Sequence, residues 1–209
     1  TTLYAALKLV NSIDRKIYTV EDPVEYQLNG VNQLQIHPKI GLDFASALRS
    51  ILRQDPDVIM VGEIRDPETA KIAIQASLTG HLVLSTLHTN SAAATVVRLL
   101  DMGIENYLLA STLNAVIAQR LVRKLCPHCT QKSDLALDVF KKFAGEGAFS
   151  EWHDGPNLRK SVGCQRCQNT GYSGRTTIME VMTVNDPIRA KIAVSAGDRE
   201  IERLAIASG

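Results

Sequence analysis

The segment spanning residues 55–90 constrains the fold more than any other part of the chain. It contains two short apolar runs, residues 58–61 and 82–84, separated by a stretch of helical length in which Asp66 can cap a helix that Pro67 opens. Continuous apolar runs of this length are typical of strands that are buried on both faces. Two such strands joined by a helix form a βαβ unit. The segment therefore predicts an α/β fold built around a parallel sheet.

Polar and ionisable side chains follow both apolar runs. Glu63 lies just beyond the first run, and Thr86 and His88 follow the second, while His81 precedes it. Ligands of open α/β sheets bind at the carboxyl ends of the strands. We therefore expect Glu63, Thr86 and His88 to converge on one ligand, with His81 as a further candidate, although a lone histidine at such a position can also be structural.

The remaining sequence up to residue 122 continues the alternation of strands and helices. Capping residues, apolar spacing and β-branched residues locate the elements. We predict strands over 17–20 and 31–36 and helices over 3–10, 44–52 (capped by Asp43), 92–103 (capped by Ser91) and 106–122. The expected core is a mostly parallel sheet flanked by helices.

Two more carboxylates could join the ligand site. Glu21 ends the strand over 17–20, and Glu25 follows four residues later. Three carboxylates at one sheet edge would repel one another unless a cation were present. A divalent cation with a polyphosphate would explain the three, because one carboxylate could hold the metal's waters while another orients or deprotonates an attacking water. Either Glu21 or Glu25 could instead form a salt bridge with a neighbour.

Three arginines are candidates for contacts with phosphate. Arg49 and Arg53 share one face of their predicted helix, and Arg65 lies close to Glu63. A guanidinium group suits phosphate oxygens, and one that reaches across a subunit boundary could stabilise the charge of a transferring phosphoryl group. The alternative is that these arginines are solvated on the helix surface.

The four cysteines form two pairs with two-residue spacing. Cys126 and Cys129 form the first pair, and Cys164 and Cys167 form the second, 34 residues later. Two such pairs can supply the four thiolates of a tetrahedral zinc site. Disulfides or unrelated buried thiols are the alternatives, and disulfides are disfavoured in a chain that looks cytosolic. His128 and His153 are substitute ligands that the site does not need.

The character of the sequence changes beyond Leu125. We predict an α/β core over 1–122, a small metal-binding subdomain over 123–175 that the metal stabilises, and the start of a helical subdomain over 176–209. The net charge of +1 gives no general attraction for nucleic acid. No apolar run approaches the roughly 18 residues that span a bilayer, and the first residues lack the pattern of a signal peptide. A cytoplasmic location is expected.

Four motifs together resemble the secretion ATPase superfamily, specifically the type II secretion and type IV pilus assembly ATPases. VEDPVEY (20–26) matches the aspartate box of that family, and the stretch from Asp57 to Glu63 within DPDVIMVGEIRD matches its atypical Walker B motif, in which Gly62 precedes Glu63. TGHLVLSTLHTN (79–90) matches its histidine box. LCPHC, GCQRC and GYSGR match the tetracysteine element, which is typical of the assembly and secretion branch and missing from the retraction ATPases.

The resemblance implies a RecA-like fold and a role for each site residue. Glu63 would position magnesium with ATP, and His88 would contact the γ-phosphate region. A glutamate of the aspartate box would activate water; Glu21, at the end of its strand, is the preferred residue and Glu25 the alternative. The three arginines would respond to nucleotide or contact a neighbouring subunit.

The resemblance also implies partners and a location. The family members are homohexamers that work with inner-membrane platform proteins and their cytoplasmic domains, which would place this protein at the inner face of the bacterial inner membrane, held there through its partners. The chain contains no phosphate-binding G-x-x-x-x-G-K-[ST] loop and resembles the family from just after the lysine of that loop. We therefore expect this piece alone to bind nucleotide poorly and not to hydrolyse it.

Two other functions are compatible with parts of the sequence. A zinc-stabilised interaction module with an inactive α/β scaffold would explain the cysteines but not the polar residues at the strand ends. A RecA-like nucleic-acid motor would share the sheet, but the near-neutral charge and the 5% aromatic content offer no strand-binding path.

Overall fold

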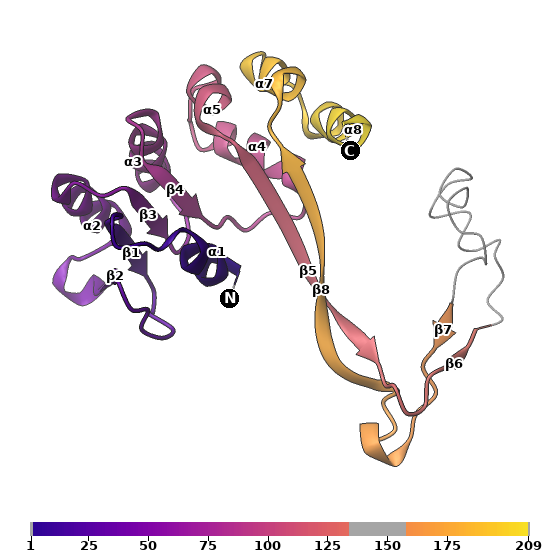
Figure 1. The fold of residues 1–209 in the computed structure, drawn as a ribbon. Helices are drawn as coiled ribbons and strands as arrows, with labels where there is room; N and C mark the ends of the chain where they lie inside the picture. The colour runs from indigo at the N-terminus through magenta and orange to yellow at the C-terminus, as the bar shows by residue number, and fades with distance from the viewer. Residues whose placement is uncertain (1, 134–157, 209) are drawn as a thin grey trace. The chain divides into compact units, whose positions relative to one another are not determined.

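The computed structural model describes residues 2–133 and 158–208 of the chain (Figure 1). Internal contacts divide the chain into two compact units. The first unit combines residues 1–118 and 180–209, and the second unit comprises residues 119–179. None of the helices in the described ranges has the length and apolar character that crossing a bilayer requires.

The first unit contains a four-stranded parallel sheet (Figure 1). Its order is β2-β1-β3-β4, and each neighbouring pair is parallel. The strands are β1 (Ile17–Glu21), β2 (Val31–Gln35), β3 (Val58–Val61) and β4 (Leu82–Ser85). The register aligns Val20 of β1 with Val61 of β3, and Val61 with Ser85 of β4, so these three strands end at the same level. The predicted parallel sheet is confirmed.

The strands of this sheet differ in burial. All four residues of β3 are buried, whereas β4 is partly exposed and Leu82 exposes 40% of its surface. The prediction that residues 82–84 are buried on both faces is therefore wrong. The reason is topological: β4 is an edge strand of the four-stranded sheet, and no strand in the described ranges pairs with its outer side.

Helices cover both faces of the sheet (Figure 1). Helix α1 (Thr2–Val10) forms a small core on one face. Helices α2 (Phe44–Ile51) and α3 (Pro67–Leu78) belong to the main core on the other. Residues 58 and 60 of β3 contribute to the small core and residues 59 and 61 to the main core, which is why this strand has no polar alternation.

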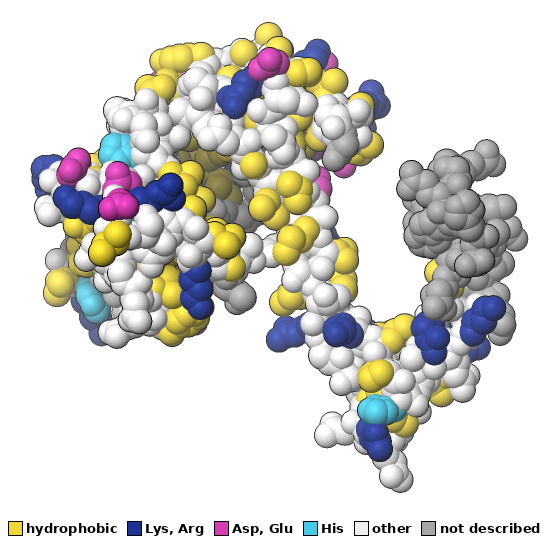
Figure 2. Space-filling model, viewed as in Figure 1, with side chains coloured by type: hydrophobic (Ala, Val, Ile, Leu, Met, Phe, Trp, Pro, Cys, Tyr) yellow, Lys and Arg dark blue, Asp and Glu magenta, His cyan; other side chains and the backbone are white. Residues whose placement is uncertain are grey.

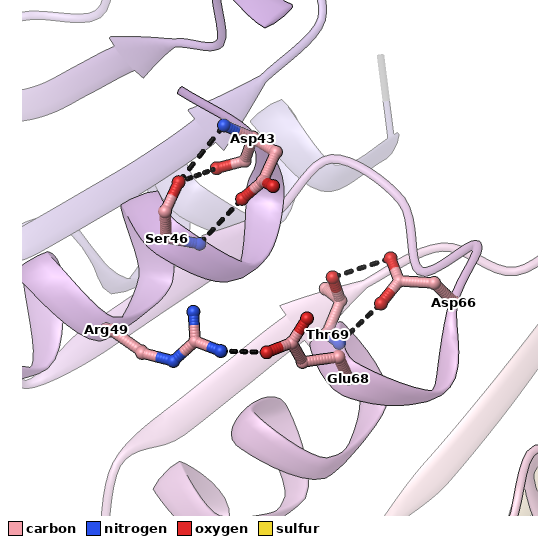
Figure 3. A network of polar contacts seen from close by, with 6 residues as sticks. All are labelled: Asp43, Ser46, Arg49, Asp66, Glu68 and Thr69. Atoms are coloured by element: carbon pink, nitrogen blue, oxygen red, sulfur yellow. Dashed lines mark hydrogen bonds and ion pairs between the residues drawn. The ribbon is translucent and has the colours of Figure 1, made fainter. Parts of the chain in front are cut away.

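The caps predicted for α2 and α3 are confirmed (Figure 3). An Asp43 side-chain oxygen accepts from the Ser46 backbone N–H at 2.8 Å, and the Ser46 hydroxyl accepts from the Asp43 backbone N–H, which forms a capping box. Asp66 accepts from both the backbone N–H and the hydroxyl of Thr69, at 2.8 and 2.7 Å. After α2, a short 3-10 turn over Leu52–Gln54 leads to β3.

Four more helices complete the main core. They are α4 (Ala92–Asp101), α5 (Asn106–Thr112), α7 (Asp186–Ala193) and α8 (Asp198–Ala207). α7 packs against α5, and α8 packs against α4. Ile188, Ile192 and Ile201 are fully buried at these contacts. The two C-terminal helices thus lie in the same compact unit as residues 1–118.

The predicted helix over 106–122 is only partly correct. α5 ends at Thr112, Leu113 is extended, and β5 (Ala115–Leu125) follows. β5 pairs with β8 (Tyr172–Thr183) in a two-stranded sheet. The spacing of the apolar residues in 115–122 is compatible with the period of a helix and with that of a strand. The strand that pairs with this segment is about fifty residues away in sequence, so local spacing could not reveal the pairing.

The second unit contains the cysteine pairs, together with the larger parts of β5 and β8. β6 (Gln131–Lys132) and β7 (Arg159–Lys160) pair in antiparallel fashion, and a 3-10 turn covers Gln165–Cys167. The predicted substitute ligand His153 lies outside the described residues. Among the described residues of this unit, only Cys126, Cys167 and Gly171 are buried, so the unit has almost no apolar core.

Candidate functional site

The loops after β3 and β4 are tied together at the carboxyl edge of the sheet. The Thr86 hydroxyl donates to the Gly62 carbonyl at 2.7 Å, and the Ile64 N–H donates to the Thr86 carbonyl at 2.9 Å. Glu63 lies between these two bonds. The structure thus places the residue after β3 and the residue after β4 on one supported edge, as the sequence predicts.

Glu63 and His88 meet at this edge. The Glu63 side chain is only 14% exposed, and its Oε2 accepts from Arg65 Nε at 2.6 Å and lies 3.3 Å from His88 Nε2. The hydrogen bond and the charge of Glu63 raise the pKa of Arg65. The second carboxylate oxygen accepts no hydrogen bond from the described residues, so Glu63 keeps one oxygen for a further ligand.

Glu21 also lies at this edge but is not accessible. It is 4% exposed at the end of β1, and its carboxylate accepts hydrogen bonds from the Tyr4 hydroxyl, the Thr19 hydroxyl and the Gln33 amide nitrogen. All three donors are neutral. Side chains of the protein itself therefore satisfy the hydrogen bonding of this carboxylate.

Glu25 differs from Glu21 in this respect. It is exposed in the loop that follows β1, and its carboxylate has no hydrogen bond or ion pair with any described residue. Its backbone N–H is held at 3.3 Å from the Tyr4 hydroxyl oxygen. Of the two carboxylates, only Glu25 has a side chain free to reach a ligand.

Arg49 of α2 and Arg53 of the 3-10 turn that follows it make local contacts instead of contacts at this edge. Arg49 forms an ion pair with Glu68 at the start of α3 (Figure 3). Arg53 donates to the Arg49 carbonyl at 3.0 Å and to the Ser50 hydroxyl at 3.3 Å. Of the three predicted arginines, the structure brings only Arg65 to Glu63.

His81 lies at the other end of β4 from Thr86 and His88. Its Nδ1 is 2.9 Å from the Ala76 carbonyl oxygen and 3.1 Å from the Thr79 hydroxyl oxygen, so it closes the carboxyl end of α3. Because β4 separates it from the carboxyl edge of the sheet, the structure does not bring His81 to the other candidate residues. Its role here is to end a helix.

Gly62 is required by the close approach of β1 and β3. Its N–H donates to the Val20 carbonyl at 2.8 Å, and a Cβ at this position would lie 3.1 Å from that same oxygen and 3.5 Å from the Glu21 Cα. Both atoms belong to the backbone, so relief would separate the strands. This explains why glycine precedes Glu63.

We expect Gly62→Ala to lower the free energy of unfolding of the first unit by about 1–3 kcal/mol, because the added methyl group overpacks two hydrogen-bonded strands. Chemical denaturation of the chain measures the change. Gly197→Ala is the matched control, since Gly197 has an ordinary φ of −69° and no heavy atom within 4 Å of an added Cβ. Equal effects of the two substitutions would contradict this account.

The four cysteines form one cluster in the second unit. All four thiols are free of disulfides, and their sulfur atoms lie within 4.8 Å of one another. Cys167 Sγ is 3.8 Å from the sulfur atoms of both Cys129 and Cys164. Four thiolates bound to zinc at about 2.3 Å would stand about 3.8 Å apart, the edge of a tetrahedron of that size. The donor set therefore fits a four-thiolate metal site.

Backbone N–H groups point at these sulfur atoms. Cys167 Sγ accepts from the N–H groups of Cys164 and Gly171, both at 3.2 Å, and Cys129 Sγ accepts from Gly163 at 3.4 Å. Burial raises the pKa of Cys129 to about 11. Burial acts on Cys167 in the same direction, but these N–H donors and the neighbouring thiols outweigh it and lower the pKa of Cys167 to about 6. The cluster thus already stabilises one thiolate.

His128 does not join the cysteine cluster. Its ring nitrogens lie 3.1 and 3.2 Å from an Arg166 guanidinium nitrogen, and the group of metal-binding side chains among the described residues consists of cysteines alone.

The sequence interpretation did not identify the residues that surround Glu21. Tyr4 lies in the helix predicted over 3–10 and Gln33 in the strand predicted over 31–36, and no role at Glu21 was predicted for either residue. A usable signal was present: a carboxylate at the end of an apolar strand needs donors if it is buried, and a tyrosine and a glutamine were available on neighbouring elements.

Comparison with known proteins gives matches along the entire chain. A family model described as "Type II/IV secretion system protein" matches residues 1–209. Type II secretion system protein E of Aeromonas hydrophila is 52% identical over 210 residues, which cover 98% of this chain and 40% of that protein. The protein of the same name from Xanthomonas campestris pv. campestris is 54% identical over 209 residues, covering 100% and 36%. The chain thus spans about two fifths of the length of these relatives.

Solved structures show the same fold. The pilus retraction motor PilT with bound ADP superposes with a TM-score of 0.65 at 29% identity, covering 98% of this chain and 48% of that one. The ATPase DotB of Legionella pneumophila gives a TM-score of 0.60 at 25% identity, covering 96% and 46%. The predicted RecA-like fold is thereby confirmed.

Proposed function

Because the chain belongs to the type II/IV secretion system protein family, we propose that it is the C-terminal part of a hexameric ATPase motor that drives pseudopilus or pilus assembly. The relatives named as type II secretion proteins, at 52% and 54% identity, favour the pseudopilus of type II secretion. PilT, described as a motor with bound ADP, supports nucleotide as the ligand.

This proposal rests on the edge of the sheet after β3 and β4, where hydrogen bonds link the two loops. Glu63 is held there by Arg65 and lies beside His88, and it keeps one carboxylate oxygen without a partner among the described residues. A bound magnesium ion would supply charge neutralisation for the phosphates. Glu63 would hold the waters of that ion, and His88 would contact the terminal phosphate. Thr86 supports both residues through its bond to Gly62.

Glu25 is the better candidate for activating water. The sequence favours Glu21 because it ends its strand, but in the structure Glu21 is only 4% exposed and its carboxylate is hydrogen-bonded to three side chains of the protein. A general base needs to reach the proton that it removes. Glu25 is exposed and unpaired among the described residues, so it meets this requirement.

In the full-length protein we expect Glu25→Gln to reduce kcat for ATP by about a hundred-fold or more, since general bases contribute about 10²–10⁴. The substitution keeps the shape of the side chain, so KM should change little. Steady-state phosphate release measures both. Glu202→Gln, at another exposed position, in α8, is the control and should match the wild type. A Glu25→Gln variant with wild-type kcat would remove Glu25 from the mechanism.

The arginines have separate roles in this proposal. Arg65 orients Glu63, whereas Arg49 would have to leave Glu68, and Arg53 would have to leave the Arg49 carbonyl, before either could reach a phosphate. Nucleotide or a neighbouring subunit could compete for them, because a guanidinium group binds phosphate at least as well as an exposed carboxylate. We propose Arg49 and Arg53 as residues that respond to nucleotide.

The cofactors and partners follow from the same assignment. We propose magnesium with ATP at the sheet edge and structural zinc at the four cysteines. The motor would be a homohexamer that acts on inner-membrane platform proteins and their cytoplasmic domains, at the inner face of the bacterial inner membrane. No nucleic-acid partner is proposed, since the net charge is only +1.

A second candidate function is a zinc-stabilised interaction module without catalysis. The tight cysteine cluster favours it, because that site does not depend on the sheet edge. Magnesium-dependent ATP hydrolysis by the full-length wild-type protein separates the two: turnover supports the motor, and its absence in the assembled protein supports the module.

A further inference from the structure

The Tyr4 hydroxyl joins three separate elements of the first unit. Tyr4 is 5% exposed on α1, and its hydroxyl donates to the Glu21 carboxylate at the end of β1. The same oxygen accepts from the Glu25 backbone N–H and from Gln33 Nε2 of β2, both at 3.3 Å. One oxygen atom therefore connects α1, two neighbouring strands and the loop after β1.

The number of donor and acceptor sites on each group determines which group donates in these contacts. A phenol has one proton and two acceptor sites. The backbone N–H of Glu25 and the amide of Gln33 can only donate, so they take the acceptor sites, and the proton of Tyr4 goes to Glu21. Burial and the bond to Glu21 raise the pKa of Tyr4, so the phenol keeps its proton. Donor and acceptor are therefore fixed in all three hydrogen bonds of the Tyr4 hydroxyl.

Glu21 has no cation among its partners. The Tyr4 and Thr19 hydroxyls and the Gln33 amide satisfy its carboxylate, and no buried side-chain nitrogen or oxygen among the described residues lacks a partner. Burying a carboxylate is costly unless it is fully hydrogen-bonded. Such a carboxylate is an anchor: the donors around it are held in place because releasing them would leave a buried charge unsatisfied.

The loop that carries Glu25 depends on such anchors. Residues 22–30 form no helix or strand. The Val24 N–H donates to the Gln35 side chain at 3.2 Å, the Leu28 N–H donates to the Gln33 side chain at 2.7 Å, and the Glu25 N–H donates to Tyr4. Of these three, only the bond to Tyr4 ties the loop to α1 and fixes the residue with the exposed carboxylate.

We propose that Tyr4 and Glu21 are positioning residues that hold the backbone of Glu25, so that its carboxylate is presented at the sheet edge in one conformation. This inference rests on the proposed function, in which Glu25 activates water. Glu21 then acts through Tyr4 and never touches the reacting atoms. Because Tyr4 lies in the first turns of α1, the same contact ties the position of Glu25 to that of the helix start.

Amide hydrogen exchange on this chain tests the structural part. Tyr4→Phe removes one hydroxyl and keeps the ring that packs against Tyr26, whose centroid is 4.6 Å away. We expect the Glu25 amide to exchange about three- to ten-fold faster, the loss of one net hydrogen bond, while residues 58–61 keep their protection. Tyr18→Phe is the matched control, since Tyr18 lies on β1 and its hydroxyl has no hydrogen bond to Glu21.

Steady-state kinetics on the full-length protein test the functional part. Tyr4→Phe should lower kcat for ATP about ten-fold and leave KM within about two-fold, because the base is misplaced while the binding groups remain. Tyr18→Phe should leave both unchanged. A general loss of stability would also lower the apparent kcat, because less protein would be folded; unchanged amide protection of residues 58–61 excludes that cause.

The outcomes separate this inference from the function on which it rests. Unchanged exchange at Glu25, a kcat equal to that of the wild type, or equal losses in Tyr4→Phe and Tyr18→Phe would overturn the positioning role. If Glu25→Gln retains full turnover, the assignment of the base is wrong, whatever Tyr4→Phe does. Loss of turnover in Glu25→Gln with a normal Tyr4→Phe variant defeats the inference alone.

Discussion

Glu63→Gln should reduce kcat for ATP in the full-length protein by about a thousand-fold or more, the largest effect we expect from a single substitution. The amide keeps the size of the side chain but removes the charge that meets Arg65 at 2.6 Å and His88 at 3.3 Å. Groups that stabilise charge at a transferring phosphate act in the transition state, so their loss falls on kcat. Phosphate release at saturating magnesium and ATP measures the effect.

Glu200→Gln provides the control for this experiment. Glu200 also forms an ion pair, with Lys191 at 2.5 Å, but the pair joins α8 to α7 rather than lying at the sheet edge. Its loss should change stability by less than about 1 kcal/mol and should leave kcat unchanged. Binding of ATP to Glu63→Gln, measured by calorimetry, should persist within a few-fold. Wild-type turnover in Glu63→Gln would defeat the proposed motor function.

Removing the metal should unfold the second unit while the first unit stays folded. Among the described residues of the second unit, only two cysteines and Gly171 are buried, so apolar burial contributes little there. Zinc binding to four thiolates can supply about 10–16 kcal/mol of apparent free energy at pH 7. We expect about one zinc per chain by elemental analysis, and loss of amide protection over 123–132 and 159–172 after chelation.

Two comparisons make this test specific. Residues 58–61 of β3 lie in the first unit and should keep their protection in the same sample, and added zinc should restore the second unit. Cys129→Ser removes one of the clustered sulfur atoms and should reproduce the effect of the chelator. A metal-free chain with full protection of the cysteine segments would show that zinc is not the source of stability.

Local signals in the sequence located most elements of the first unit correctly. Asp43 and Asp66 begin α2 and α3 as predicted, because an N-cap side chain bonds to a backbone N–H only two or three residues away. The apolar run over 58–61 is a strand buried on both faces. The cysteine spacing also led to the right cluster, since two-residue spacing already brings two thiols of a pair together.

Features that depend on residues distant in sequence could not be predicted from local patterns. The stretch after Thr112 looked helical, but it pairs with β8 in a strand. His88 was the main candidate and His81 a further one; in the structure His88 meets Glu63, whereas His81 ends α3. Glu21 looked like the residue nearest to the ligand, yet Tyr4 and Gln33 enclose it. For β5, His88 and Glu21 the deciding neighbour is far away in sequence, whereas the partners of His81 are only two and five residues away.

The sequence by itself determined the α/β class, the helix caps, the cysteine site and the family, because those depend on short spacings and on motifs. Only the tertiary structure decided which of two nearby carboxylates is free, since Glu21 and Glu25 have the same chemistry and differ only in what surrounds them. Glu21 becomes buried and hydrogen-bonded only when α1, β1 and β2 pack together, and this packing cannot be inferred from the order of residues along the chain.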